Sequence, residues 1–355
     1  MMRPSALVKS SKWPLILPNK SGFRETHIAL AHGNGGRLMR ELIDQVFVPA
    51  LTNPYLNTDA DAVALPCPPE AELVLTTDGF TVQPLEFPGG NIGSLAVHGT
   101  VNDLSVSGAT PRYMTLSVFL EEGLEIATLR RIVEALGKAA RECGIAVVTG
   151  DTKVVGRGEC DGMYVSVTGV GFRPRGSRFA LDQVRVGDRL LVSGPIGEHG
   201  AAVMLARQEF GLRGDLQSDA ASVYPEAQIL MTIEGLRFMR DPTRGGLATV
   251  AHEIARATGL AVRLSEANIP IADSVQSLCE LLGFDPLYMA CEGRLVAVIA
   301  PEQAEASLAL LRTVAPGARL IGTVTQEPAQ VILETSFGGE RSLDELEDDP
   351  LPRIC

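Results

Sequence analysis

Four aspartates in the first half of the sequence follow a predicted strand or lie in a turn, where a carboxylate can reach a ligand. They are Asp61 in TDADAV, Asp78 in TTDG, Asp103 in VNDL and Asp151 in TGDTK. Carboxylate oxygens are the hard ligands that Mg²⁺ prefers, usually together with water and phosphate oxygens. Lys153 follows Asp151 by two residues and is suited to a phosphate. The group indicates a site for Mg²⁺ and phosphate, and the alternative is a set of solvated turn residues and helix caps.

Two glycine-rich segments precede predicted helices and are candidates for binding an anion. The first is GNGG, which contains Gly35 and Gly36, and the second is DPTRGG, which contains Thr243, Arg244 and Gly245. Backbone N–H groups in glycine loops and at helix N-termini attract oxyanions, and an arginine adds a charged fork. Both segments can also be plain helix starts. That interpretation is favoured for GNGG, whereas the arginine favours phosphate binding by DPTRGG.

A glutamate and the last cysteine are the other candidates for chemistry. Glu292 lies in ACEG, immediately before a predicted strand, where it is either a general base or a loop cap, and the sequence favours the cap. Cys355 ends the arm SLDELEDDPLPRIC, whose charge and prolines predict mobility. A thiol on a tether suits a carrier that visits two active sites, although a terminal cysteine is usually incidental.

Composition excludes several classes of function. The 355 residues carry a net charge of −12 and 5% aromatics, which argues against a nucleic-acid binder. No apolar run reaches the roughly 18 residues of a membrane span. The cysteines show no CxxC and the histidines no HxxH, so no zinc site or disulfide framework is indicated. Residues 1–27 are broken by prolines and do not form a secretory signal, so we expect a loosely ordered extension on a cytoplasmic protein.

Strands and helices alternate along both halves of the chain, which predicts an α/β or α+β protein of two similar-sized domains. In the first half we expect strands at 73–77, 112–121, 145–149 and 164–171, and helices at 38–51, 92–109 and 126–143. In the second half we expect strands at 188–193, 294–300, 320–324 and 330–334, and helices at 200–208, 227–235, 247–258 and 302–314. The polar segment RPRGSR separates a first domain, 28–175, from a second, 176–341, and the arm 342–355 follows.

Taken in order, seven segments resemble the HypE family of hydrogenase maturation factors. They are AHGNGG (31–36), FPGGNIG (87–93), NDLSVSGATPRY (102–113), VTGDTKVV (148–155), DPTRGGLATV (241–250), CEGRL (291–295) and PRIC (352–355). That family is part of an ATP-binding superfamily with aminoimidazole ribonucleotide synthetase, selenophosphate synthetase and thiamine-monophosphate kinase. The PRIC terminus distinguishes the family within it. The resemblance implies two α+β domains, of which the first dimerises through its sheet to build nucleotide sites at the subunit interface and the second is an α/β sandwich.

The resemblance also implies a reaction. The carbamoyltransferase HypF would place a carbamoyl group on Cys355, and ATP with Mg²⁺ would drive its dehydration to a thiocyanate. The cyano group would then pass to iron in the HypC–HypD complex, as a ligand of the [NiFe]-hydrogenase centre. The expected protein is therefore a cytoplasmic homodimeric enzyme that binds neither nucleic acid nor membrane.

Site residues follow from the same resemblance. Asp61, Asp78, Asp103 and Asp151 would hold Mg²⁺ and phosphates, although Asp59 could replace Asp61 in the loosely patterned TDADAV segment. The ATP-binding set would be Gly35, Gly36, Asn102, Lys153, Thr243, Arg244 and Gly245. Cys355 would carry the substrate, Glu292 would remove a proton, and Asp103 would share that task.

Two alternative functions remain open at this point. A small-molecule kinase or synthetase of the same superfamily would use the same ATP site and would not need Cys355. Selenophosphate synthetase is weakened as an interpretation, because no cysteine precedes Cys67. A non-catalytic scaffold whose acidic arm binds partners would turn over no ATP.

Overall fold

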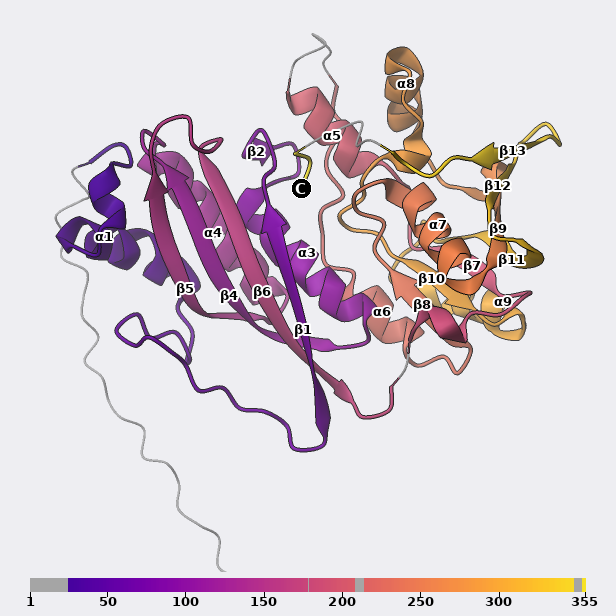
Figure 1. Cartoon of the computed structure of the whole chain (residues 1–355), viewed down its shortest axis with the longest axis horizontal. Coiled ribbons are helices and arrows are strands. Elements are labelled where there is room, and N and C mark those ends of the chain that lie inside the picture. Colours follow the sequence, from indigo (N-terminus) through magenta and orange to yellow (C-terminus); the bar gives the residue numbers. More distant parts are fainter. Residues whose placement is uncertain (1–24, 178, 208–213, 348–352) are drawn as a thin grey trace, which may run out of the picture.

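The structure, a computed structural model, describes residues 25–177, 179–207, 214–347 and 353–355. Two domains stand side by side, each built on its own β-sheet, and the C-terminus returns to the boundary between them (Figure 1). Within the described residues, no helix is long and apolar enough to cross a membrane.

The first domain is a four-stranded sheet with helices on one face (Figure 1). Its strand order is β1-β6-β4-β5, with β4 and β5 parallel and the other neighbours antiparallel. The bounds are β1 (Ala71–Phe80), β4 (Thr110–Glu121), β5 (Ala146–Val155) and β6 (Met163–Pro174), with the short hairpin β2 (Glu86–Phe87) and β3 (Gly90–Asn91) beside them. The predicted strands and helices of this domain are therefore all present, with longer strands than expected.

Helices α3 (Ile92–Val106) and α4 (Ile126–Glu142) pack together behind the sheet. The apolar residues of α4 recur at helical spacing and are buried, as its sequence predicts. Gly93 permits the close approach of the two helices, because a Cβ there would lie 2.4 Å from the carbonyl oxygen of Ile132. Asn91 starts α3 by accepting hydrogen bonds from the N–H groups of Gly93 and Ser94.

A helical segment lies against the β5 edge of this sheet. Its parts are η1 (Leu30–Gly33), α1 (Arg37–Leu42), η2 (Ile43–Phe47) and α2 (Val48–Leu51). His27 forms a β-bridge with Glu125, so the folded part begins before residue 28, where the extension was expected to end.

The second domain is a seven-stranded sheet with helices on both faces. Its strand order is β13-β12-β9-β11-β7-β10-β8. The strands are β7 (Arg189–Val192), β8 (Leu236–Arg240), β9 (Leu260–Ser265), β10 (Val296–Ile299), β11 (Arg319–Pro328), β12 (Val331–Glu334) and β13 (Glu340–Leu343). The helices are α5 (Glu198–Ala206), α6 (Tyr224–Leu230), α7 (Gly246–Thr258), α8 (Asp273–Leu282) and α9 (Ala304–Leu311), with short turns η3 (Leu181–Gln183), η4 (Glu266–Asn268), η5 (Pro286–Tyr288) and η6 (Pro301–Gln303).

Strand β10 shows why this sheet has helices on both faces. Its four residues are all buried and alternate between two cores. Val296 and Val298 join the core under α7, whereas Ala297 and Ile299 join the core under α6 and α9. Side chains of successive strand residues point to opposite faces, so a continuous apolar run requires a cover on each side.

The predicted domain and arm boundaries can be placed on this frame. Strand β6 ends at Pro174 and β7 begins at Arg189, so the boundary expected at 175–176 lies between the two sheets. The boundary expected at 342 falls inside β13, which pairs with β12 up to Leu343. Of the arm, residues 348–352 lie outside the described residues, and its last three residues are docked on the protein.

Candidate active site between the two domains

The last three residues of the chain dock beside the segment that continues β1. The N–H of Thr81 donates to the carbonyl oxygen of Cys355, and the N–H of Gln83 donates to that of Arg353, each at 3.2 Å. The Ile354 side chain is 3% exposed and belongs to an apolar core to which both domains contribute. The end of the chain is therefore held like a short added strand, with the intervening side chain as an anchor.

A buried carboxyl group lies at the same boundary. Glu292 is 2% exposed, and its Oε1 has no hydrogen-bond partner among the described residues. Burial, and then the charge of Asp241, raises the pKa of Glu292 well above its usual range. Asp78 and Asp103 add to the same effect. Burial followed by the charge of Asp103 raises the pKa of Asp241 to about 7. A buried carboxyl group without a hydrogen-bond partner, whose pKa is shifted by burial and by neighbouring charges, is typical of a group that transfers protons.

Phe80 and Gly99 connect this carboxyl group to the docked terminus. A Cβ on Gly99 would lie 3.0 Å from the Phe80 ring and 3.9 Å from Oε2 of Glu292. The residue after Phe80 is Thr81, which holds the carbonyl of Cys355. The end of β1 therefore carries the terminal residue and borders the buried carboxyl group.

Asn102 fixes the loop that presents Glu292. Its Nδ2 donates to the carbonyl oxygens of Ala221 and Glu292 at 3.0 and 2.9 Å, and its Oδ1 accepts from the N–H of Val223 at 2.8 Å. The side chain is 1% exposed. These bonds use its amide nitrogen and its oxygen, and all three partners belong to the second domain. The expected contact of Asn102 with ATP stays a prediction, and in the structure its side chain joins the first domain to the second. We assign Asn102 to alignment of the two domains.

We expect Asn102→Ala to lower the free energy of unfolding by about 2–4 kcal/mol, because two carbonyls and one N–H would remain buried without partners. Thermal or urea denaturation measures the change. Gln228→Ala is the matched control, since its amide donates to the Tyr224 hydroxyl on an exposed surface. An equal effect of the two variants would contradict the assignment.

Asp219 holds the Glu292 loop through hydrogen bonds to its main chain. Its carboxylate accepts from the N–H groups of Glu292 and Gly293 at 3.1 and 3.3 Å and lies 3.6 Å from the guanidinium of Arg294. The loop passes so close that a Cβ on Gly293 would lie 1.8 Å from the carbonyl oxygen of Asp219. The glycine of the CEGR motif is therefore required by packing. Cys291, the first residue of this motif, is fully buried.

The DPTRGG segment forms the other wall of the site. The N–H of Cys291 donates to the carbonyl of Pro242, which ties this segment to the Glu292 loop. Arg244 is exposed and lies close enough to Asp78 to lower its pKa, although burial raises that pKa overall. Gly245 has φ +73°, and a Cβ there would lie 2.0 Å from the hydroxyl of Thr249. The segment leaves Arg244 available to an anion at the start of α7.

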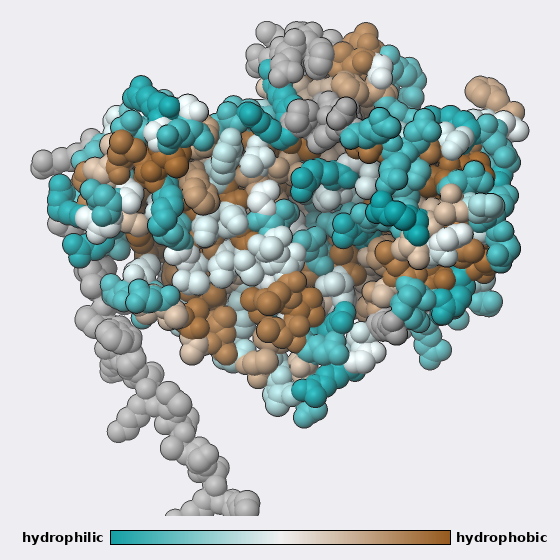
Figure 2. All heavy atoms as spheres, viewed as in Figure 1, coloured by the Kyte–Doolittle hydropathy of each residue, from teal (hydrophilic) through white to brown (hydrophobic). Residues whose placement is uncertain are grey.

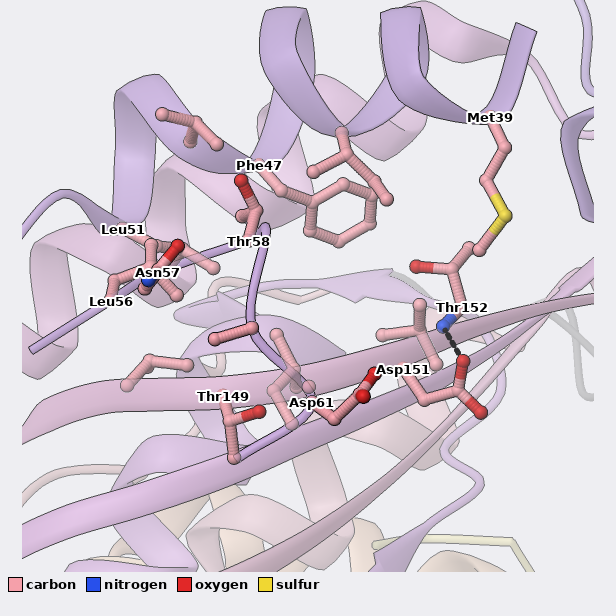
Figure 3. Close-up of a pocket in the computed structure, with 17 residues that line it drawn as sticks. Met39, Phe47, Leu51, Leu56, Asn57, Thr58, Asp61, Thr149, Asp151 and Thr152 are labelled. Atoms are coloured by element: carbon pink, nitrogen blue, oxygen red, sulfur yellow. Dashed lines mark hydrogen bonds between the residues drawn. The ribbon is translucent and has the colours of Figure 1, made fainter. Parts of the chain in front are cut away.

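A pocket with a volume of 520 Å³ lies at the other edge of the first domain (Figure 3). Asp61 and Asp151 both line it, but the carboxylate of Asp151 is turned away from Asp61 and accepts from the N–H of Thr152 at 2.8 Å. Met39 and Phe47 line its apolar side. Lys153 forms an ion pair with Asp151 at 2.8 Å. The loop that contains Gly35 and Gly36 borders the pocket, because the N–H of Gly35 contacts the sulfur of Met39.

The four aspartates therefore form two groups instead of one. Asp78 lies within β1 and Asp103 within α3, instead of at a strand end or in a turn, and the hydroxyl of Thr76 on β1 donates to Asp103 at 2.6 Å. Asp61 and Asp151 lie by β5, and β1 and β5 are opposite edges of the sheet. In the described part of the chain, no group of three or more acidic, cysteine or histidine side chains could hold a metal ion. The roles expected for the four aspartates in binding Mg²⁺ and phosphate stay predictions, and strand order places the two groups at opposite edges of one sheet.

Three functional candidates carried no usable signal in the sequence. His199 contacts the docked terminus, Asp219 positions Glu292, and Arg207 donates to the carbonyl oxygens of Gln83 and Arg353. Each acts across a large separation in sequence, and no motif spacing predicts such contacts. Asp241 is different, since it begins the DPTRGG motif and could have been singled out there.

Comparisons with known proteins agree with this architecture. The N-terminal domain model of AIR synthase related protein matches residues 59–172, and the C-terminal domain model matches residues 185–334. The two sheets and the intervening site thus define an AIR synthase-related protein of two domains. A thiamine-monophosphate kinase from Stenotrophomonas maltophilia shares the fold at 21% identity, with a TM-score of 0.64, a coverage of 83% of this chain and 95% of the other.

Relatives with much higher identity narrow the class. Carbamoyl dehydratase HypE of Escherichia coli K12 is 44% identical over 93% of this chain and 99% of its own length, and HypE of Cupriavidus necator is 46% identical over 92% and 95%. A solved HypE in complex with ATP has a TM-score of 0.86 at 44% identity, covering 92% of this chain and 99% of the other. A solved HypE–HypF complex has a TM-score of 0.75 at 39% identity, covering 86% and 99%. The chain belongs to the HypE family of carbamoyl dehydratases, which confirms the resemblance drawn from its motifs.

Proposed function

We propose that this protein dehydrates a carbamoyl group carried on its own Cys355, with ATP as the driving reagent. The docked terminus is the observation that carries the proposal. Thr81 holds the main chain of Cys355 at the end of β1, and the buried carboxyl of Glu292 borders the same strand end. The substrate is therefore part of the enzyme, and the site is formed when the terminus docks.

The chemistry explains why such a site needs a nucleotide and a base. An amide oxygen is a poor leaving group, and transfer of the γ-phosphoryl group of ATP to that oxygen converts it into phosphate. Each of the two N–H protons must be lost, one as the phosphorylated imidate forms and one as phosphate leaves. The products are the thiocyanate, ADP, phosphate and a proton. Glu292 accepts a proton at the nitrogen, and Asp103 at the same boundary shares the task.

The pocket at the β5 edge suits a nucleotide. Its apolar side can receive the nucleobase. Asp61 and Asp151 supply two carboxylates, which is the number of protein ligands that Mg²⁺ commonly takes beside phosphate oxygens. The fit rests on this donor set. Lys153 would then exchange its ion pair with Asp151 for a phosphate, and Mg²⁺ would neutralise charge on the transferring group.

Two copies of the chain would complete the nucleotide site through the open face of the first sheet. The helices cover only one face, and the other bears exposed Leu73, Leu75 and Phe119. In Figure 2 the surface over this sheet carries brown and pale patches. Lys153 lies beside Phe119 in the register of β4 and β5, so a second copy on this face would border the phosphate residues.

We expect Leu75→Asp to convert the dimer into a monomer, because it places a charge in an apolar interface. Light scattering after size-exclusion chromatography measures the mass. Leu281→Asp is the matched control, since this leucine is equally exposed but lies on α8 of the second domain. A monomeric wild-type protein, or a dimeric Leu75→Asp variant, would refute the interface.

Partners follow from the same proposal. A HypF-type carbamoyltransferase would load Cys355, and the similarity of this chain to the HypE–HypF complex supports HypF as a partner. A HypC–HypD complex would accept the cyano group for the iron of a [NiFe] centre. Delivery to either partner requires the terminus to leave its docked position, so the protein would act as a carrier.

Intact-protein mass spectrometry tests the function directly. With HypF, carbamoyl phosphate and ATP, the protein should gain about 43 Da and then retain about 25 Da, as expected for addition of HNCO followed by loss of water. Both changes should map to the C-terminal peptide. ATP hydrolysis coupled to phosphorylation of a small molecule, with no adduct on Cys355, would instead establish the kinase alternative.

A further inference from the structure

A buried histidine of the second domain contacts the docked terminus and has no place in the reaction described above. His199 is the second residue of α5 and is fully buried. Its Nε2 lies 2.7 Å from the carbonyl oxygen of Ile354, the residue before Cys355. Its Nδ1 lies 2.7 Å from the hydroxyl of Ser218. Both ring nitrogens are therefore used.

The partners of His199 determine its tautomer. A carbonyl oxygen can only accept, so Nε2 carries the hydrogen and donates it to Ile354. Nδ1 then accepts from the hydroxyl of Ser218, whose oxygen in turn accepts from the N–H of Ala220 at 3.0 Å. Burial lowers the pKa of His199 to about 4, so the ring is neutral at neutral pH. The neutral ring therefore has a single N–H donor, at Nε2, which is directed at the carbonyl oxygen of Ile354.

The surroundings hold the ring in place. Phe87 of the first domain packs edge-on against the imidazole, with ring centroids 5.3 Å apart. The N–H of Ser218 donates to the carbonyl of Pro88 at 2.8 Å, so the residue that orients the histidine is itself fixed to the first domain. The imidazole is thus held from both domains at the point where the terminus enters.

We propose that His199 is a positioning residue that holds the C-terminal peptide in place while its cysteine is dehydrated. This inference rests on the proposed function. The hydrogen bond goes to the main chain of Ile354 and not to the cysteine side chain, so it is the same for a thiol, a thiocarboxamide and a thiocyanate. His199 therefore sets how much of the protein has its terminus docked, and it leaves the chemistry on sulfur to other groups.

Two substitutions of His199 distinguish a hydrogen bond to Ile354 from packing of the side chain alone. His199→Gln keeps an N–H near the position of Nε2, whereas His199→Asn has a shorter side chain that cannot reach Ile354. Protein already carbamoylated by HypF is mixed with ATP, and the rate of dehydration is followed by mass. We expect about a tenfold loss of rate for His199→Asn and a loss of less than about threefold for His199→Gln, as expected for one buried hydrogen bond. The rate of carbamoylation should not fall in either variant, because HypF acts on the undocked terminus.

A second measurement detects docking without the reaction. Unmodified protein is alkylated with iodoacetamide, and the C-terminal peptide is released with a glutamate-specific protease. Labelling of Cys355 should be about tenfold faster in His199→Asn than in wild type or His199→Gln, because a larger share of the termini is undocked. The exposed Cys67 is the internal control and should react equally in all three proteins.

The outcomes distinguish the two proposals. Equal labelling and equal dehydration in all three proteins would overturn the role of His199, as would a His199→Gln variant that behaves like His199→Asn. A wild-type protein that is carbamoylated but never dehydrated would overturn the proposed function, and the labelling experiment would still decide whether His199 holds the terminus.

Discussion

Glu292→Gln is expected to leave carbamoylation of Cys355 intact and to slow dehydration by at least about a hundredfold, the lower range for loss of a positioned general base. The substitution keeps the size of the side chain and its place in the loop, which is fixed by main-chain bonds to Asn102 and Asp219. A gain of about 43 Da that does not decline when ATP is added would be the result.

The dependence on pH gives a second readout of the same residue. Burial and neighbouring carboxylates raise the pKa of Glu292, so the protonated form predominates at low pH and cannot accept a proton. The rate of dehydration of previously carbamoylated protein should rise with pH and level off above that pKa. Glu292→Gln should lack this rise. Normal thiocyanate formation by the variant, or a wild-type rate that falls over the same range, would assign the base to another group such as Asp103.

Cys355→Ser is expected to abolish both mass changes while the terminus remains docked. The contacts of Cys355 with Thr81 involve its main-chain carbonyl, so a hydroxyl in place of the thiol leaves them unaltered. Oxygen is a much weaker nucleophile than a thiolate at neutral pH. Intact mass after incubation with HypF and ATP measures the loss, and ATP binding by calorimetry should be unchanged.

Deletion of the last five residues serves as the comparison for this variant. It should abolish carbamoylation as well, with fold and ATP binding retained, but it also removes Ile354 from the apolar core. A modest loss of thermal stability is therefore expected for the deletion and not for Cys355→Ser. Carbamoylation of either variant by HypF would refute the carrier role of the terminal cysteine.

Strong periodicity made the first domain predictable from sequence. Helix α4 and strand β4 match their expected ranges closely, since their apolar residues repeat at 3.6 and 2 residues. Elements with weak patterns were missed. Strand β8 has two arginines among five residues, and β13 exposes three of its four residues, so neither has an apolar signal. Strand β9 and helix α8 lie in a stretch for which no element was expected.

The site was predictable only in part for a related reason. Motifs identified Glu292, Asp78, Asp103 and Arg244, which the structure gathers at one boundary. The separation of Asp61 and Asp151 from them depends on strand order, which single-sequence patterns do not contain. His199 reaches Ile354 over 155 positions, and an isolated histidine gives no indication of such a contact.

The docking of the terminus through its main chain has a consequence for what else can enter the site. A tethered group is present at a local concentration in the millimolar range, whatever the concentration of protein. A free carbamoyl compound or a foreign thiol peptide would have to displace this resident end before it could react. The enzyme is thereby insulated from competing metabolites, and each loading of Cys355 yields one product. Its output is set by how often the end is reloaded, and the toxic cyano group never has to diffuse as a free molecule.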